Sequence, residues 1–434
     1  MKPLLEIDEQ SRCDLGLMGD LRNSPLFKLF DHTYTRGGTQ HLQQLFLQPL
    51  SAEEDIKKRI RMFSYLSAIG LDFPFPSNLF DIVERYMQHS QAEEQEREAL
   101  YLQDKEIEEG VLAMLDLLQR VDSFFHSDAA MKAVGLEELV TSILSILSLP
   151  SLQPVLGSFN GKKLSYSAVT AFDTLFRSVA WIELKELLQH LYRLDAYLAV
   201  GKSASKHGWA LPTVLPRGTG ILRATGVYYP TIEGAVANSF EFSKERRLLF
   251  LTGANMAGKS TFLRSLALAL YLAHLGFPVP AVSMEFSVLD GIFTTINLPD
   301  DLGMGASHFY VEVLRVKDVV ESLRAGKSIF VIFDELFRGT NVKDAMEATV
   351  AVSRRFLQSE NSQFVISSHI VEATEPLCEE GAIGFQFLPT KMEGHRPVYT
   401  YTLEDGVSDD RHGMLIIQNE QILDILEKGV THEI

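Results

Sequence analysis

The chain has 434 residues, of which 46% are hydrophobic and 22% are charged. This composition allows large buried cores and excludes an intrinsically disordered chain. The formal net charge of −17 argues against a protein that coats nucleic acid through its overall charge, but it does not exclude a local basic groove.

Cysteine content and hydropathy exclude further classes of protein. Cys13 and Cys378 are too few for a disulfide framework, and no Cys/His cluster has the spacing of a zinc site. The N-terminus lacks the pattern of a signal peptide, and no apolar stretch approaches about 18 uninterrupted residues. We therefore expect a cytoplasmic protein with no membrane partner.

The N-terminal half has the pattern of helices. Leucines recur at helical spacing in 184–198, and Pro150 and Pro154 interrupt the pattern where a helix is expected to end. A cluster of Pro and Gly at 211–220 marks a boundary. We predict one domain over 1–215 and a second over 216–434.

The second half alternates strands and helices. A helix is predicted from Lys259 until Gly276 and Pro278 end it, and the alternation in 398–407, with its Asp-Gly pair, predicts a hairpin. Three apolar runs are typical of buried parallel strands: 246–253, 328–335 and 363–369.

The segment Thr252–Thr261 reads TGANMAGKST and contains the phosphate-loop pattern G-x-x-x-x-G-K-[ST]. Backbone N–H groups of such a loop bind phosphate oxygens, Lys259 would reach the β- and γ-phosphates, and Ser260 would bind Mg²⁺. The alternative is a glycine-rich turn without a ligand. The predicted nucleotide-binding residues are Gly253, Ala254, Asn255, Met256, Ala257, Gly258, Lys259, Ser260 and Thr261.

Two further polar groups stand at predicted strand ends. Asp334 suits the Mg²⁺ and Glu335 suits the attacking water of a phosphoryl transfer, although an acidic pair there could also cap a helix. His369 could sense the γ-phosphate or be a structural histidine. Glu335, His369 and Lys259 are thus the candidate catalytic residues.

Together these motifs resemble the MutS family of DNA mismatch repair ATPases, which is related to ABC-type ATPases. Asn238 matches an asparagine that the family carries shortly before the phosphate-loop strand. A weaker resemblance to the family's helical lever runs from residue 4 to about 215. The matching stretches are TGANMAGKSTFLR, VPA (279–281), GASHFYVEV (305–313), DELFRGT (334–340) and SSHIVE (367–372).

The resemblance implies an all-α lever or core domain followed by an α/β P-loop ATPase domain of the ABC type. It implies ATP and Mg²⁺ as cofactors, nucleotide contact by Asn238, and a homodimer whose sites are shared. Ser307 would contact the γ-phosphate from the partner subunit, and Asp344 would lie in the loop that crosses the interface. DNA, and a repair partner protein, are the expected partners.

Several family features are missing. The resemblance places the start of the chain in the lever region, without the mismatch-binding and connector domains. This region is expected to be too short for a full DNA-clamp insertion, which would normally interrupt it near residues 150–170. We therefore expect DNA binding that is weak or depends on DNA structure, without mismatch recognition.

The ATPase motifs also depart from the family. Ala235 stands where the family has a base-stacking aromatic, with Tyr228 or Tyr229 as substitutes. His308 replaces a threonine and Phe337 replaces a glycine. Asn341–Val342 replaces a Ser-Thr pair. These changes bear on rate and nucleotide preference.

Two other functions compete with this one. A nucleotide-dependent dimerisation platform without catalysis is disfavoured by the intact Lys259, Ser260, Asp334 and Glu335. An ABC-type ATPase acting on RNA or ribosomes is disfavoured because the signature element reads GASHF instead of LSGGQ.

Overall fold

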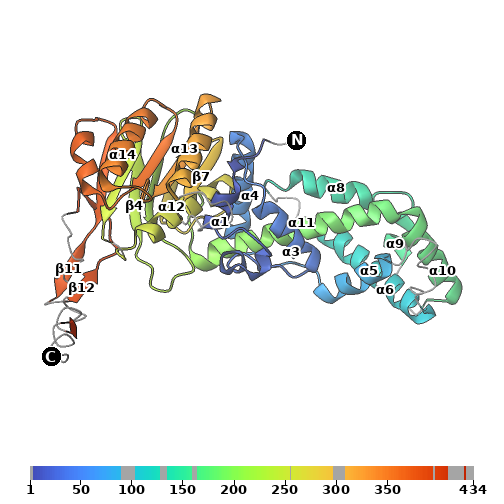
Figure 1. Ribbon diagram of the computed structural model, residues 1–434. Helices are drawn as coiled ribbons and strands as arrows, with labels where there is room; N and C mark the ends of the chain where they lie inside the picture. The colour runs from blue at the N-terminus through green and yellow to red at the C-terminus, as the bar shows by residue number, and fades with distance from the viewer. Residues whose placement is uncertain are drawn as a thin grey trace. The chain divides into compact units, whose positions relative to one another are not determined.

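The computed structural model describes residues 3–88, 103–127, 134–158, 164–254, 256–296, 308–393, 396–408 and 425–426. It has a mixed α/β fold that divides into two compact units (Figure 1). Unit 1 comprises Met1–Leu26, Gln48–Lys57 and Trp209–Ile434, and unit 2 comprises Phe27–Leu47 and Lys58–Gly208.

The units are interleaved along the chain. The sequence predicts a single boundary at 215/216, whereas the chain leaves unit 1 after Leu26 and after Lys57 and returns after Leu47 and after Gly208. The N-terminal residues belong to unit 1 because β1 (Glu6–Ile7) pairs with a strand of its sheet.

Unit 2 is built around the long helix α11 (Trp181–His207), which packs on α3. The leucines of 184–198 that predicted this helix are buried. Pro150 follows the end of α8, as predicted, whereas Pro154 lies in the first turn of α9, where its missing N–H costs nothing. The other helices are α3 (Arg36–Phe46), α5 (Ser77–Gln88), α6 (Asp104–Phe125), α8 (Glu137–Leu147), α9 (Gln153–Ser158), α10 (Tyr166–Thr174) and the π-helix Leu175–Val179; α4 (Glu53–Ile69) begins in unit 1.

A buried carboxylate fixes the start of α3. Asp195 of α11 is 1% exposed and accepts hydrogen bonds from Tyr34 N, Thr35 N and Thr35 Oγ1, at 3.0, 2.8 and 2.7 Å. A Cβ on Gly38 would lie 2.2 Å from Asp195 Oδ2, so only glycine permits this approach. Asp195 thus joins two helices that are some 160 residues apart in the sequence.

Unit 1 contains a seven-stranded sheet in the order β1-β7-β8-β9-β5-β10-β13. Its strands run parallel except for β13. The three predicted buried strands are present as β5 (Leu248–Gly253), β8 (Ile329–Asp334) and β9 (Gln363–Ser367). The remaining strands are β7 (Gly291–Thr295), β10 (Ile383–Leu388) and β13 (Glu404–Asp405).

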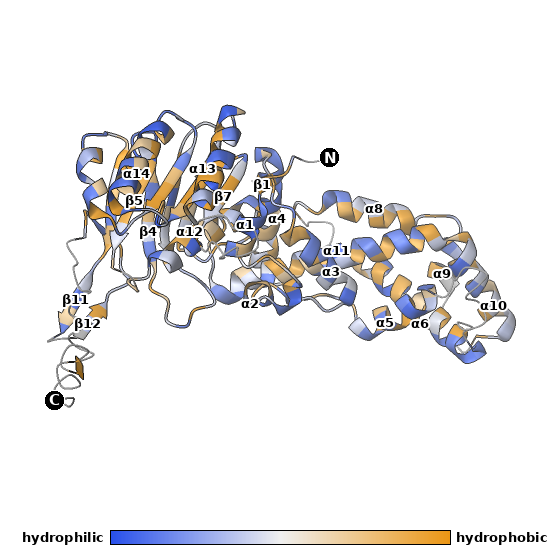
Figure 2. Cartoon of the chain, in the orientation of Figure 1, coloured by the Kyte–Doolittle hydropathy of each residue, from blue (hydrophilic) through white to orange (hydrophobic). Residues whose placement is uncertain are grey.

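Both faces of this sheet are covered, which explains its hydrophobic strands (Figure 2). On one face, Phe250, Val331 and Phe364 pack in a core with α13 (His308–Arg324) and α14 (Val342–Phe356). On the other, Phe330 contacts Phe242 edge-on. That residue belongs to a second sheet, β2-β6-β3-β4 (Thr213–Leu215, Ser283–Ser287, Leu222–Val227 and Asn238–Phe242).

Helix α12 (Lys259–His274) contacts strands of both sheets, and most of its residues are buried. The short elements are α1 (Glu9–Asp14), α2 (Pro25–Lys28) and the 3₁₀ turns Leu21–Asn23, Val371–Ala373 and Glu375–Leu377. Among the described residues, no helix is long and apolar enough to cross a membrane.

The C-terminal hairpin differs from its prediction. β11 (Thr390–Glu393) pairs with β12 (Arg396–Tyr399), so the hairpin closes before the predicted Asp-Gly turn. Asp405 lies instead in β13, at the sheet edge. The backbone of Tyr401 and of Leu403 is bound by the Asn238 side chain, described below, and residues 400–403 do not continue the strand.

Candidate nucleotide-binding site

A cavity of about 520 Å³ opens at the carboxyl ends of β5, β7 and β8. Ligands collect at this edge of parallel sheets because loops and helix N-termini converge there. The phosphate loop and the Asp334–Glu335 pair meet in its wall, together with three residues that the sequence did not predict. The lining residues are Ala254, Met256, Gly258, Lys259, Ser260, Thr261, Ile296, Asp334, Glu335, Arg338 and Tyr401.

The phosphate loop has a backbone that few residues tolerate. Gly253 and Gly258 have φ of +140° and +99°, and Met256 adopts the left-handed region at +73° with its side chain 75% exposed. A Cβ on Gly258 would also lie 2.9 Å from Tyr401 Cδ1. Gly258 precedes α12, so the first N–H groups of this helix open into the cavity.

Lys259 lies within the loop. Its ammonium donates to Gly253 O at 2.8 Å and Ala254 O at 3.2 Å, and the residue is only 5% exposed. Burial lowers the pKa of Lys259, and the nearby Glu335 and Asp334 carboxylates oppose that shift. The Lys259 ammonium is therefore held by the carbonyls of the phosphate loop, at the wall of the cavity.

Asp334 is oriented by two hydroxyls. Ser260 Oγ donates to Asp334 Oδ2 at 2.5 Å, and Ser367 Oγ donates to Asp334 Oδ1. The hydroxyl and carboxylate expected to share a Mg²⁺ are thus adjacent, although 74 residues separate them in the sequence.

Glu335 follows on a strained turn. The φ of Glu335 is +56° and that of Phe337 is +64°. The Glu335 N–H donates to Ser367 O at 3.0 Å. Strained backbone of this kind concentrates at functional sites. Arg338 Nη1 lies 3.8 Å from Glu335 Oε2, so a cation and a carboxylate meet at the cavity wall.

A second cavity of about 340 Å³ shares Gly258, Thr261 and Tyr401 with the first. Ala235 lies in its wall. Of the two tyrosines considered as its substitutes, Tyr229 also lines this cavity, whereas the Tyr228 hydroxyl accepts a hydrogen bond from Trp209 Nε1 at 2.9 Å.

Asn238 lines the second cavity while holding the C-terminal segment. Its Nδ2 donates to Tyr401 O at 2.9 Å, and its Oδ1 accepts from Leu403 N at 2.7 Å. The predicted nucleotide-binding asparagine thereby places Tyr401, whose φ is +54°, between the two cavities.

The other predicted residues are placed less centrally. His369 is exposed just after β9 and is not among the described residues that line the cavity. Asp344 is exposed in the first turn of α14, where Asn341 Oδ1 accepts from its N–H at 3.0 Å as the helix cap. Asn255 and Ser307 lie outside the described residues, as does the side chain of His308.

Three lining residues were not predicted from the sequence: Ile296, Arg338 and Tyr401. Arg338 could have been found, because it follows Glu335 closely in DELFRGT. Ile296 and Tyr401 carry no comparable local signal, since only the fold brings them to the phosphate loop.

The donor set suits a Mg²⁺ that is bound together with phosphate. Mg²⁺ prefers oxygen ligands and is usually held by one or two carboxylates plus substrate phosphates. Ser260 and Asp334 supply such oxygens. Within the described ranges, no group of three or more His, Cys, Asp or Glu gathers that could hold a metal by itself.

The family model of MutS domain V matches residues 249–428. The match begins in β5 and includes the phosphate loop, the Asp334–Glu335 pair and Tyr401. Members of this family are ATPases that bind DNA in mismatch repair. Residues 249–428 therefore carry a MutS domain V, which supports a MutS-family protein.

Proposed function

We propose that this chain is a Mg²⁺-dependent ATPase that couples ATP binding and hydrolysis to DNA binding in mismatch repair or a related DNA transaction. The observation that carries the proposal is the Ser260–Asp334 hydrogen bond beside the buried Lys259 ammonium, with Glu335 in the same cavity wall. A glycine-rich turn without a ligand would need none of these groups.

The two cavities bind different parts of the nucleotide. The triphosphate occupies the first, bound by Lys259 and the N–H groups at the start of α12, with Arg338 as a further cationic contact. The base enters the second, where Tyr229 and Tyr401 offer aromatic faces in place of the absent ring at Ala235. Gly258, at the shared wall, leaves room for the ribose.

Hydrolysis requires a water aligned with the γ-phosphate and stabilisation of the charge that develops on it. Glu335 aligns the water, Lys259 stabilises the charge, and His369 senses the γ-phosphate from the end of β9. Mg²⁺, held by Ser260 and Asp334, would neutralise phosphate charge when bound.

We further propose a homodimer in which the face around the site is covered by a second copy. Apolar side chains exposed in the cavity wall support this: Met256 is 75% exposed and Tyr401 46%. In such a dimer Ser307 and Asp344 would act on the partner's nucleotide. Unit 2, Phe27–Leu47 and Lys58–Gly208, would serve as the lever and unit 1 as the ATPase domain.

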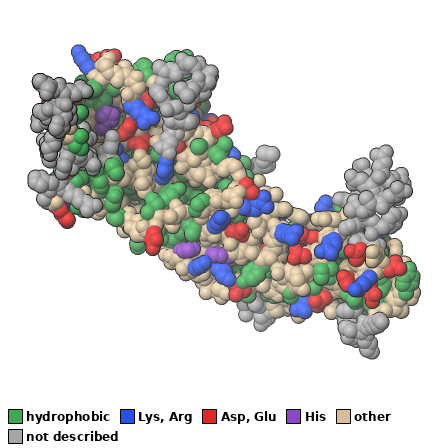
Figure 3. Space-filling view, turned by 60° about the horizontal axis from the view of Figure 1, so that its bottom comes forward, with side chains coloured by type: hydrophobic (Ala, Val, Ile, Leu, Met, Phe, Trp, Pro, Cys, Tyr) green, Lys and Arg blue, Asp and Glu red, His purple; other side chains and the backbone are tan. Residues whose placement is uncertain are grey.

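DNA binding is proposed to be weak or structure-dependent. On the face seen in Figure 3, Lys and Arg side chains are interspersed with Asp and Glu, which does not support tight binding through phosphate contacts alone. ATPase rates measured with duplex, mismatched, branched and single-stranded DNA would identify the ligand. Tight mismatch-selective binding at physiological salt would contradict this part of the proposal.

The variant Glu335→Gln tests the ATPase itself. It should bind ATP with nearly wild-type affinity but hydrolyse it about 10²- to 10⁴-fold more slowly, because an amide cannot accept a proton from water. The matched control is Glu347→Gln, an exposed residue of α14. Equal, near-background turnover by Glu335→Gln and wild type, with ATP still bound, would favour the non-catalytic dimerisation platform.

A further inference from the structure

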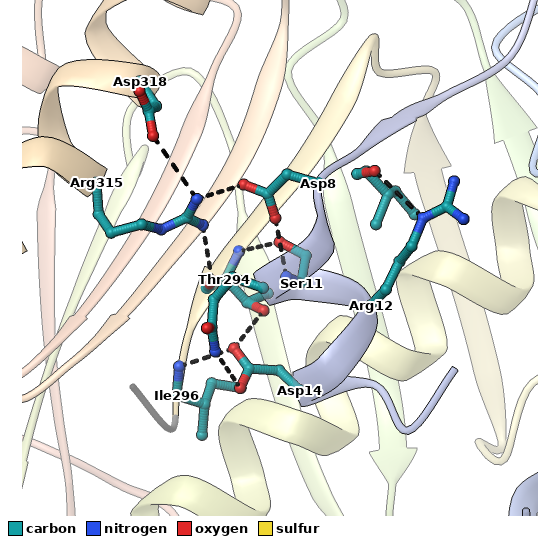
Figure 4. A network of polar contacts seen from close by, with 10 residues as sticks. Asp8, Ser11, Arg12, Asp14, Thr294, Ile296, Arg315 and Asp318 are labelled. Atoms are coloured by element: carbon teal, nitrogen blue, oxygen red, sulfur yellow. Dashed lines mark hydrogen bonds and ion pairs between the residues drawn. The ribbon is translucent and has the colours of Figure 1, made fainter. Parts of the chain in front are cut away.

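The N-terminal segment, residues 3–15, covers the free side of β7 (Figure 4). β1 pairs with the first half of that strand, with Glu6 opposite Gly291 and Ile7 opposite Ile292. The chain then turns into α1, and strand pairing stops. The later backbone groups of β7 would lack partners on this side unless something else supplied them.

Side chains of α1 take the place of the missing strand. Ser11 Oγ accepts from Thr294 N at 2.7 Å, and Asp14 Oδ2 accepts from Ile296 N at 2.9 Å and from Thr294 Oγ1 at 2.7 Å. Ser11 is 0% exposed and Asp14 is 6% exposed. A buried carboxylate is costly unless such bonds are complete, so these contacts are strongly specified.

A cation from α13 closes the network. Arg315 Nη2 donates to Thr294 O at 3.1 Å, and its Nη1 lies 2.6 Å from Asp8 Oδ2. Asp8 is the N-cap of α1, since its Oδ1 accepts from Ser11 N at 2.8 Å. Arg315 therefore binds the end of β7 and the start of α1 with one planar group.

This network reaches the candidate site through Ile296. Its N–H is held by Asp14, and the same residue lines the cavity together with Lys259 and Asp334. A carboxylate of the N-terminal segment is thus hydrogen-bonded directly to a residue of the nucleotide cavity wall.

We propose that Asp14 and Arg315 are positioning residues of the nucleotide site, so that docking of α1 and binding of nucleotide strengthen each other. The inference rests on the proposed function and assigns a regulatory input to it. Coupling between two sites is reciprocal: if α1 improves nucleotide affinity, bound nucleotide must stabilise α1 by the same factor. A purely structural anchor would stabilise the fold without this second effect.

Hydrogen exchange on the full chain, with and without Mg²⁺ and a non-hydrolysable ATP analogue, tests the coupling. Nucleotide should slow amide exchange in peptides covering residues 4–17 of the wild type. Asp14→Asn should reduce that protection and raise the nucleotide Kd about three- to tenfold, with a smaller change in kcat. The matched control, Asp20→Asn, changes an exposed carboxylate that lies shortly after this segment and pairs with Arg22 outside the network.

Arg315→Lys provides a milder second variant in case Asp14→Asn fails to fold. It keeps the charge beside Asp8 but loses the forked contact with Thr294 O, and it should shift the Kd in the same direction. Wild-type binding without protection of 4–17, or unchanged Kd in both variants despite lower melting temperatures, would overturn the inference alone. Absence of Mg²⁺-nucleotide binding by the wild type would overturn the proposed function, and the inference with it.

Discussion

The Ser260 hydroxyl donates to Asp334 Oδ2 at 2.5 Å, across the gap between the phosphate-loop helix and β8. With Ser367 bonded to the second oxygen, both oxygens of this carboxylate are oriented. Ser260 and Asp334 thus offer two adjacent oxygen ligands beside the cavity. Loss of either oxygen should affect nucleotide binding only when Mg²⁺ is present.

We therefore expect Asp334→Asn to weaken ATP binding in Mg²⁺ by about tenfold or more, which corresponds to ~1.4 kcal/mol per factor of ten. Binding in EDTA should change little, because the amide still fills the same space. Titration calorimetry in the two buffers measures the difference. Asp116→Asn, a change at a half-exposed residue of α6 that pairs with Arg120, serves as control, and an equal loss with and without Mg²⁺ would contradict the metal role.

Gly258→Ala should weaken nucleotide binding for two separable reasons. Alanine at φ +99° is strained by about 1–3 kcal/mol, and its Cβ meets the Tyr401 ring at 2.9 Å. The control Gly326→Ala has a φ of +76° but open space around its Cβ, so it carries strain without a clash. Fluorescent-nucleotide titration should show a loss for Gly258→Ala only, and equal behaviour of the two would argue against a close approach of Tyr401.

Asp195→Ala should destabilise unit 2. It removes the acceptor for Tyr34 N, Thr35 N and the Thr35 hydroxyl, and buried donors left unpaired cost about 1–3 kcal/mol each. Thermal and urea unfolding of the variant measure the change. Asp81→Asn, which is exposed and only loosely paired with Arg36, should leave stability within about 0.5 kcal/mol. Similar midpoints for both variants would be evidence against the cap.

Stability should fall as the pH drops from about 6.5 to about 4. Burial lowers the pKa of His274 from 6.5 to about 4, with a smaller contribution from Arg217, opposed by the hydrogen bond to Leu50 O and by Asp290. Because the unfolded chain takes up the proton first, His274 alone should remove roughly 1 kcal/mol between pH 7.5 and 5.5. Burial lowers the pKa of His41 to about 4 as well, which adds a second contribution of the same sign.

His274→Asn tests this dependence, since its amide can still donate to Leu50 O without titrating. Urea unfolding at pH 7.5 and 5.5 should show a smaller difference for this variant than for wild type, with the part from His41 remaining. The exposed His126→Asn should retain the wild-type difference. An unchanged difference in His274→Asn would show that this histidine does not set the acid sensitivity.

The sequence alone could predict the features that depend on short runs of consecutive residues. The apolar runs at β5, β8 and β9 and the phosphate loop all follow local patterns, and parallel pairing then brings Ser260 to Asp334. The family resemblance identified Asn238 as a candidate site residue. It did not predict that the Asn238 side chain binds the backbone of Tyr401 and Leu403.

Local sequence patterns could not predict side-chain contacts between residues that are far apart in the sequence. Tyr401 reaches the site only because Asn238 binds the chain 163 residues later. The N-terminal segment resembles the family's lever in sequence, yet it packs against β7 in unit 1. Periodicity identifies a helix and its buried face, but it does not identify the partner of that face.

The bond from Thr294 N to Ser11 Oγ joins residues 283 positions apart. During synthesis, residues 3–15 leave the ribosome long before β7 exists, so unit 1 cannot be completed until most of the chain has been made. The contacts of Phe27–Leu47 with Lys58–Gly208 can form earlier. Unit 2 should therefore fold first during translation, and contacts of such high sequence separation should make unit 1 the slow and aggregation-exposed step.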